Sequence, residues 1–369
     1  MKIAHVLDTL SVGGAERVVL TLSALQIKQG HSVEVHYLFA GGSLETEFVR
    51  LGVGVYSATA PGTLKIIARL YRNFMTTKPD VAHFHNATAA IYGPLAALLA
   101  HVRARVSTRH GLVPPRGGWL RESKFWLAAR LCFRAVAVSS QTERNMRAFP
   151  LSIPSKITLI VNGSFPAKSS SDEDAPKSDL FTFVHVARLT PVKNQARLVE
   201  AFVGAFQQNP RLRLILVGDG PLRGGLEQLA ASLGVESNVI FAGERENIGN
   251  WFAVSNCFVL TSTTEGTPIS LLEALAAALP CIVSNVGEMP AILDRCHCGL
   301  VVSPDSVQQL TAAMLQIASL GAERLATLSR NARREYEAQF QPEVMAECYL
   351  EIYRRALRAS PVAGTLPPR

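Results

Sequence analysis

The chain has 369 residues, of which 48% are apolar and 18% charged, and its formal net charge is +8. This length allows two domains of ordinary size, and the composition is that of a folded globular protein, which excludes a disordered or fibrous chain. No apolar run approaches the ~18 residues that span a bilayer, and the first apolar run is too short for a signal peptide.

The first half of the chain alternates short apolar runs with helical patterns. Helices are expected at 16–29 and 87–101, and strands at 3–7, 32–39, 81–85, 105–108 and 135–139. Asp8 and then Gly13 and Gly14 follow the first strand. Glycines here would let a ligand approach the backbone, because they carry no Cβ. The alternative is that they only make a tight turn from strand to helix.

The net positive charge is concentrated between residues 103 and 147. This segment holds ten arginines and lysines, against only Glu122 and Glu143 as acids, and bulky side chains such as Trp119 and Trp126 lie among them. Basic residues mixed with large apolar ones are typical of segments that dock on anionic membranes. The alternative is a core helix whose arginines reach solvent. Nucleic acid is not expected as a partner, since no nucleic-acid-binding motif accompanies the charge.

His110 follows the strand predicted at 105–108 and precedes a loop rich in glycine and proline. Ligands of parallel sheets bind at the carboxyl ends of strands. A histidine in this position could hydrogen-bond a ligand or accept a proton. His83 and His85, at the end of another strand, are rival candidates, and a structural role is the alternative for all three.

The second half of the chain restarts the alternation after a polar segment. Strands are expected at 181–186, 212–217, 239–242, 257–260 and 281–283. Such alternation predicts parallel sheets made of βαβ units, and therefore an α/β fold of two doubly wound, Rossmann-like domains facing each other across a cleft. The predicted divisions are a first domain at 1–165, a linker at 166–179, a second domain at 180–340, a last helix at 341–358 and a tail at 359–369.

Arg188 and Lys193 follow the first strand of the second half. Arginine offers a fork that matches phosphate oxygens, and lysine offers a compact charge. Together they could neutralise a diphosphate leaving group, so neither a metal nor another cofactor is expected. The alternative is a pair of solvated surface charges. The run L-V-G-D-G-P at 216–221 departs from a dinucleotide fingerprint and is interpreted as a structural turn.

The run E-G-T-P-I-S-L-L-E at 265–273 follows the strand at 257–260 and opens an apolar helical segment. Thr267 as N-cap and Pro268 in the first turn predict a helix start, whose free N–H groups bind phosphate. A carboxylate would repel phosphate there, so Glu265 and Glu273 are expected to contact hydroxyl groups. Phosphate together with hydroxyls predicts a sugar nucleotide.

The six cysteines show no framework spacing, which favours reduced thiols and a cytoplasmic location. Cys296 and Cys298 flank His297, but no second pair of ligands follows at the spacing of a zinc site. A pair of buried or loop thiols is therefore expected there.

Six motifs in a fixed order carry a resemblance to a known family: G-G-A-E-R, T-R-H-G-L, V-A-R-L-T-P-V-K-N, V-G-D-G-P, E-G-T-P-I-S-L-L-E-A and S-N-V-G-E-M-P. With them the chain resembles the GT-B glycosyltransferases of family 4, the retaining nucleotide-sugar enzymes of bacterial polysaccharide and glycolipid assembly. The resemblance implies a hexosyltransferase that uses a nucleotide-diphosphate sugar, expected to be a UDP-sugar. It also implies a saccharide or lipid-linked acceptor, and a last helix that crosses back to the first domain.

The resemblance also implies roles for individual residues. Arg188 and Lys193 would hold the donor diphosphate, Glu265 the transferred sugar and Glu273 the ribose, with His110 near the donor sugar. The other donor-binding residues that it implies are Gly13, Gly14, Arg245, Ile248, Gly266, Thr267, Ile269 and Ser270.

A covalent intermediate would need a carboxylate on the far face of the sugar, and the sequence offers no convincing candidate for this role near Gly13, Gly14 or His110. A front-face reaction is therefore predicted, in which the departing diphosphate helps to take the acceptor proton. The enzyme would act in the cytoplasm, or peripherally on the cytoplasmic face of the inner membrane. The alternatives are a nucleotide-sugar 2-epimerase of the same architecture and a catalytically silent glycosyltransferase-like subunit that only binds partners.

Overall fold

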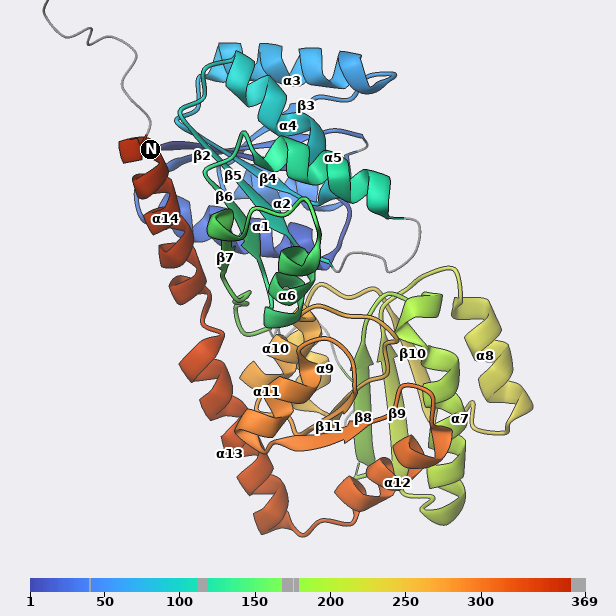
Figure 1. The fold of residues 1–369 in the computed structure, drawn as a ribbon. Helices are drawn as coiled ribbons and strands as arrows, with labels where there is room; N and C mark the ends of the chain where they lie inside the picture. Colours follow the sequence, from blue (N-terminus) through green and yellow to red (C-terminus); the bar gives the residue numbers. More distant parts are fainter. Residues whose placement is uncertain (40, 112–117, 168–174, 176–178, 360–369) are drawn as a thin grey trace, which may run out of the picture. The chain divides into compact units, whose positions relative to one another are not determined.

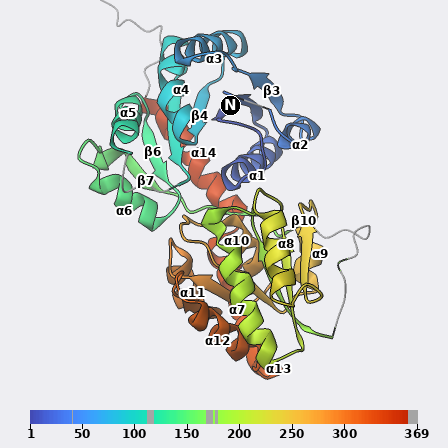
Figure 2. The ribbon, with the colours of Figure 1, turned by 90° about the vertical axis from the view of Figure 1, so that its right-hand side faces the viewer.

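The structure, a computed structural model, describes residues 1–39, 41–111, 118–167, 175 and 179–359. These residues form two compact units, each with its own sheet (Figures 1 and 2). Unit 1 consists of Met1–Gly163 and the C-terminal segment from Pro342, and unit 2 consists of Ser164–Gln341. Within the described residues, no helix is both long and apolar enough to cross a membrane.

Unit 1 is built on a seven-stranded sheet with the order β3-β2-β1-β4-β5-β6-β7, in which every adjacent pair is parallel. The strand order reverses between β1 and β4, because the chain first builds outward through β2 and β3 and then resumes on the other side of β1. The strands are β1 (Lys2–Leu7), β2 (Ser32–Tyr37), β3 (Gly54–Ser57), β4 (Val81–His85), β5 (Ala104–Arg109), β6 (Arg134–Ala137) and β7 (Ile157–Leu159).

The helices of unit 1 cover both faces of this sheet (Figure 1). Two-sided cover explains why the central strands are almost wholly buried and appear in the sequence as apolar runs. The helices are α1 (Gly14–Lys28), α2 (Leu44–Arg50), α3 (Thr63–Thr77), α4 (Ala87–Leu99), α5 (Trp119–Ala129), α6 (Ser140–Ala148), the 3-10 turn η1 (Pro154–Lys156) and the C-terminal α14 (Pro342–Ala359).

Helix α14 belongs to unit 1 although it ends the chain. It packs against α1 and β5, and its Tyr349 and Tyr353 are fully buried. The two phenol groups lie 3.2 Å from Thr108 Oγ1 and 2.5 Å from His83 Nδ1, respectively. Buried phenols need such partners. The C-terminal helix thus supplies part of the buried interior of unit 1.

Unit 2 contains a six-stranded parallel sheet with the order β10-β9-β8-β11-β12-β13, and its strand order reverses between β8 and β11. Its strands are β8 (Phe181–Val186), β9 (Leu212–Val217), β10 (Val239–Gly243), β11 (Cys257–Leu260), β12 (Cys281–Ser284) and β13 (Gly299–Val302). Its helices are η2 (Pro191–Lys193), α7 (Gln195–Gln208), α8 (Arg223–Ser232), α9 (Ile248–Ala253), α10 (Ile269–Ala276), α11 (Met289–Cys296), α12 (Val307–Ala318) and α13 (Ala322–Gln339).

The sequence predicts ten of these strands and misses β3, β7 and β13. All three lie at the edge of a sheet and have only three or four residues. An edge strand pairs on one side only, and these three are less buried than the central strands. They therefore lack the continuous apolar run that identifies a central strand.

The predicted linker at 166–179 falls in unit 2. Residues 168–174 and 176–178, most of that segment, lie outside the described residues, as does the predicted tail from residue 360. The cleft expected between the two domains stays a prediction. Cys296 and Cys298 form a disulfide, so the prediction of reduced thiols is wrong for this pair.

The loop after β9 passes so close to the loop after β8 that a side chain cannot be placed between them. Gly218 has a φ of +129°, and a Cβ there would overlap the carbonyl oxygen of Ala187. We expect Gly218→Ala to destabilise the protein by about 1–3 kcal/mol. Gly224→Ala, in helix α8 with open space around it, is the matched control and should stabilise by about 0.5–1 kcal/mol. Urea unfolding measures both, and equal stabilities would contradict this account.

Candidate functional site

The predicted cations and acid of unit 2 lie where its strand order reverses. Arg188 and Lys193 are in the loop after β8, and Glu265 is in the loop after the adjacent β11. The two loops are joined, since Thr263 N–H donates to the Val192 carbonyl at 2.8 Å and Thr261 Oγ1 donates to the Lys193 carbonyl at 3.0 Å. Ligands of such sheets bind at this crevice outside the strand ends. The three residues are therefore brought together as predicted from their positions after strands.

Lys193 and Glu265 form an ion pair that the sequence does not reveal. The Lys193 ammonium contacts Glu265 Oε1, which also accepts a hydrogen bond from Ser262 Oγ at 2.7 Å. The two side chains are only 24% and 11% exposed, so the pair is held from several sides. Arg188 is exposed. A phosphate arriving here would meet one open guanidinium and one ammonium that is already positioned by a carboxylate.

Helix α10 begins beside this pair, one residue later than predicted. Pro268 occupies the N-cap position, so the prediction of Thr267 as N-cap is wrong. The Pro268 carbonyl accepts from Leu271 N–H at 3.1 Å, and the N–H groups of Ile269 and Ser270 precede this first bond of the helix. Such N–H groups, at the positive end of a helix dipole, favour an anion.

The turn at Glu265 and Gly266 is supported by the loop after β12. Gly287 has a φ of +65°, and a Cβ there would lie 2.6 Å and 2.7 Å from the carbonyl oxygens of Glu265 and Gly266. Glu288 N–H also donates to the Gly266 carbonyl at 3.1 Å. The loop that carries S-N-V-G-E-M-P therefore packs against the E-G-T-P turn and holds its backbone in place. Glu273, one turn into α10, is buried.

Arg245 and Ile248 lie at the same carboxyl edge, in and after the loop that follows β10. Arg245 Nε donates to the Ala242 carbonyl at 2.9 Å, and its guanidinium lies over the Trp251 ring at 5.6 Å from the centroid. Ile248 is buried and starts α9. The V-G-D-G-P turn joins this loop to the Arg188 loop through Gly218 N–H to the Gly243 carbonyl, 2.8 Å, and Leu189 N–H to the Asp219 carbonyl, 2.9 Å. These hydrogen bonds support its interpretation as a structural turn.

In unit 1, Gly13 and Gly14 lie where the strand order reverses between β1 and β4. Gly13 is the N-cap of α1, and the space above it is taken by the carboxylate of Glu16, which a Cβ on Gly13 would overlap. Glu16 Oε1 accepts a hydrogen bond from Asn86 Nδ2 at 3.0 Å. Asp8, also after β1, accepts from Ala89 N–H at 2.8 Å. Burial raises the pKa of both carboxyl groups.

The sequence predicts no convincing carboxylate nucleophile near Gly13 and Gly14, and this stays a prediction, although the structure places the Glu16 carboxylate over Gly13. The sequence does not identify Asn86 as a site residue, although it directly follows the H-F-H run; its φ is +65°. A non-glycine residue in that conformation costs energy that the surroundings must supply.

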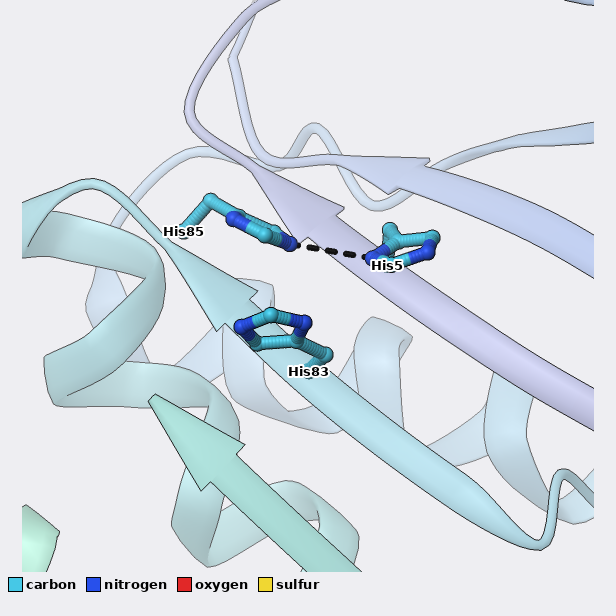
Figure 3. Close-up of side chains that lie close together, drawn as sticks. All are labelled: His5, His83 and His85. Atoms are coloured by element: carbon cyan, nitrogen blue, oxygen red, sulfur yellow. Dashed lines mark hydrogen bonds between the residues drawn. The ribbon is translucent and has the colours of Figure 1, made fainter. Parts of the chain in front are cut away.

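The histidines of unit 1 form a chain across the sheet. His83 and His85 point to one face of β4 because side chains alternate along a strand, and His5 on β1 lies in register with His83 (Figure 3). His5 Nδ1 lies 3.0 Å from His85 Nε2, and His85 Nδ1 lies 3.1 Å from His110 Nε2. His83 and His85 therefore lie inside the row of hydrogen-bonded histidines and His110 lies at its end, while the role of His110 at the donor sugar stays a prediction.

Burial keeps these histidines neutral. It lowers the pKa of His5 and of His110 to about 4, and lowers the pKa of His83 and His85 well below the usual value. Nδ1 of His110 is buried and has no hydrogen-bond partner among the residues that the structure describes. His110 can therefore accept a hydrogen bond at neutral pH.

The basic segment at 103–147 divides into interior and surface groups. Arg109 forms a buried ion pair with Glu122 at 2.6 Å, and Arg105 donates to backbone carbonyls. Trp126 is fully buried, whereas Trp119 is 64% exposed. Arg116 lies outside the described residues. The segment is thus not a single basic surface.

Known proteins match this chain over both units. The family model for glycosyl transferases group 1 matches residues 168–335, and that for glycosyltransferase family 4 matches residues 12–164. The UDP-Gal:α-D-GlcNAc-diphosphoundecaprenol α-1,3-galactosyltransferase of Escherichia coli is 25% identical over 91% of this chain and 92% of its own. The N-acetyl-α-D-glucosaminyl L-malate synthase of Bacillus anthracis is 30% identical over 47% of this chain and 45% of its own.

A solved structure shows the same fold. The crystal structure of Anabaena HepE in complex with UDP and glucose has a TM-score of 0.84, with 21% identity over 96% of this chain and all of that one. The chain therefore belongs to the group 1 and family 4 glycosyltransferases and has their GT-B fold of two parallel-sheet, Rossmann-like domains.

Proposed function

We propose that this glycosyltransferase moves a sugar from a UDP-sugar to a saccharide or lipid-linked acceptor with retention of configuration, in cell-surface polysaccharide or glycolipid synthesis. The observation that carries the proposal is the gathering of Arg188, the Lys193–Glu265 pair and the start of α10 at one reversal of strand order. The names of the relatives support the donor, since the galactosyltransferase uses UDP-Gal and HepE holds UDP.

Within this proposal the cations act on the leaving group. Arg188 and Lys193 stabilise the negative charge that develops on the diphosphate as the sugar departs, which is the type of electrostatic effect that contributes most to many enzymes. The N–H groups at the start of α10 add to it. Because these groups supply the positive charge, we propose that the reaction needs no metal.

In this proposal the two glutamates and the residues beside the nucleotide base complete the donor site. Glu265 contacts the transferred sugar, Glu273 contacts the ribose hydroxyls, and the Arg245–Trp251 pair lies beside the base. Gly13, Gly14 and His110 belong to unit 1, and their approach to the donor stays a prediction.

Removing the exposed guanidinium tests the role of the leaving-group site. We expect Arg188→Ala to lower the rate of transfer from radiolabelled UDP-sugar by about 100- to 1,000-fold, as for the loss of one transition-state donor. Arg295→Ala is the matched control, because Arg295 pairs with Glu335 between α11 and α13. A transfer rate of Arg188→Ala close to that of Arg295→Ala would sink the proposal.

The front-face mechanism is tested at the carboxylate that lies over Gly13. Glu16 lies in the first turn of α1 and its carboxylate accepts a hydrogen bond from Asn86, so it is not a free nucleophile. We therefore expect Glu16→Gln to keep transfer within about tenfold of the wild type and to form the same anomer by NMR. Loss of transfer by about 10⁴-fold or more would instead identify Glu16 as a nucleophile.

We further propose that the acceptor is reached at an anionic membrane, through a surface made by the neighbouring helices α3, α4 and α5 (Figure 1). Within helices α3 and α5, the only acid is Glu122, which is buried against Arg109. This α3–α5 surface exposes large apolar side chains: Leu64, Met75, Leu95, Leu98, Leu99, Trp119, Leu120 and Leu127. It also exposes the basic residues Lys65, Arg69, Arg72, Arg121, Lys124 and Arg130. Compared with the predicted segment at 103–147, this surface adds α3 and α4 and leaves out the interior arginines and all residues after Arg130.

Flotation with vesicles containing phosphatidylglycerol tests this surface. We expect binding that weakens as salt rises, and a loss of about tenfold or more in Trp119→Glu/Leu127→Glu, because two apolar anchors become charged. Val344→Glu, at an exposed position of α14, is the control and should bind as the wild type does. If the protein does not bind the vesicles, or if its binding does not change with salt, the proposed membrane surface is contradicted.

A further inference from the structure

We infer that Gln26, His5 and His85 form a hydrogen-bonded relay that fixes the ring tautomer of His110 and leaves its Nδ1 as a standing acceptor for a sugar hydroxyl. The three are positioning residues, since they act through His110. The part about the sugar rests on the proposed function, whereas the part about the tautomer does not.

The relay starts at the side-chain amide of Gln26, on α1. Gln26 Oε1 lies 2.9 Å from His5 Nε2. An amide oxygen can only accept a hydrogen bond, so His5 Nε2 carries the proton of this contact.

The directions of the hydrogen bonds then follow from one end to the other. A neutral imidazole carries one N–H donor and one bare acceptor nitrogen. His5 donates from Nε2 to Gln26, so its Nδ1 must accept from Nε2 of His85, 3.0 Å away. His85 Nδ1 must in turn accept from Nε2 of His110, 3.1 Å away. Nδ1 of His110 is left without a proton.

The neighbouring row of hydrogen bonds accommodates His83 as a neutral ring. The Tyr353 hydroxyl can donate to His83 Nδ1, 2.5 Å away, and His83 Nε2 can then donate to Thr108 Oγ1, 2.7 Å away. The Gln26 oxygen sets the direction of the row that ends at His110.

The cluster could also be considered as a metal site, since ligand atoms of His5, His83 and His85 all lie within 4.8 Å of one another. However, every ring nitrogen of the three already has a hydrogen-bond partner at 2.5–3.1 Å. An ion would have to break several of these bonds. We therefore assign the cluster to hydrogen bonding, and the metal content of the protein is one outcome of the test.

The relay explains why the nitrogen that is left without a partner belongs to His110. Its Nδ1 is a buried atom without a partner among the described residues, and such an atom is costly until a donor arrives. A hydroxyl group of a bound sugar can donate to it. With the opposite tautomer, Nδ1–H would donate to the hydroxyl oxygen, and the hydroxyl proton would need a different acceptor.

Histidine NMR tests the relay directly, without any variant. In protein labelled with ¹⁵N at its nine histidines, we expect His110 to show a protonated Nε2 and a bare Nδ1 near neutral pH. His85→Leu removes the acceptor for Nε2–H, so Nδ1–H should become populated. His85→Gln supplies a carbonyl acceptor and should restore the wild-type tautomer. His36→Gln, which removes a histidine bound to Glu34 elsewhere in the unit, is the control.

Binding measurements separate the relay from the proposed function. We expect His85→Leu to weaken UDP-sugar binding by about threefold to tenfold, the effect of one hydrogen bond, and to leave UDP binding unchanged. If His110 shows the expected tautomer but His85→Leu weakens UDP-sugar and UDP binding equally, or weakens neither, the sugar contact is contradicted and the relay is retained. Nδ1–H at wild-type His110, a tautomer unaffected by His85→Leu, or one equivalent of zinc in the purified protein would each overturn the relay.

Discussion

The reversal of strand order in each parallel sheet is the constraint on which the site depends. When two adjacent strands lead the chain in opposite directions, the connections that follow them separate to opposite sides, and a crevice is left at their carboxyl ends. In unit 2 this happens between β8 and β11, and the Lys193–Glu265 pair joins the two loops there. In unit 1 it happens between β1 and β4, where Gly13 and Asn86 lie. Residues distant in the sequence become neighbours through topology alone.

Unit 1 buries several polar side chains, and hydrogen bonds among them offset the free energy that their burial costs. Histidines on β1 and β4, a glutamine on α1 and two tyrosines on α14 are joined in the interior by hydrogen bonds, in part through Thr108. A buried polar network stabilises a unique arrangement when its members have partners and destabilises the fold when they lack them. The C-terminal helix supplies the two phenols, so the first domain is incomplete without the last segment of the chain.

The charges of this protein serve different purposes according to their burial. Arg109 is held by Glu122 in the interior and fastens α5 to the end of β5. Arg188 is exposed at a strand end, and the lysines and arginines of the α3–α5 surface surround apolar side chains. Net charge alone distinguishes none of these roles, because it does not report which cations already have a partner.

The sequence by itself determined the fold class, the central strands and the family motifs, because apolar periodicity and turn residues are local properties of the chain. It placed Arg188, Lys193 and Glu265 after strands, and so predicted that they would meet. It did not show the ion pair between Lys193 and Glu265, the carboxylate of Glu16 over Gly13 or the order of the histidines from His5 to His110. These depend on strand register and on which helix covers which face. The His5–His85 and Lys193–Glu265 contacts join residues 80 and 72 positions apart, and only the tertiary structure decides them.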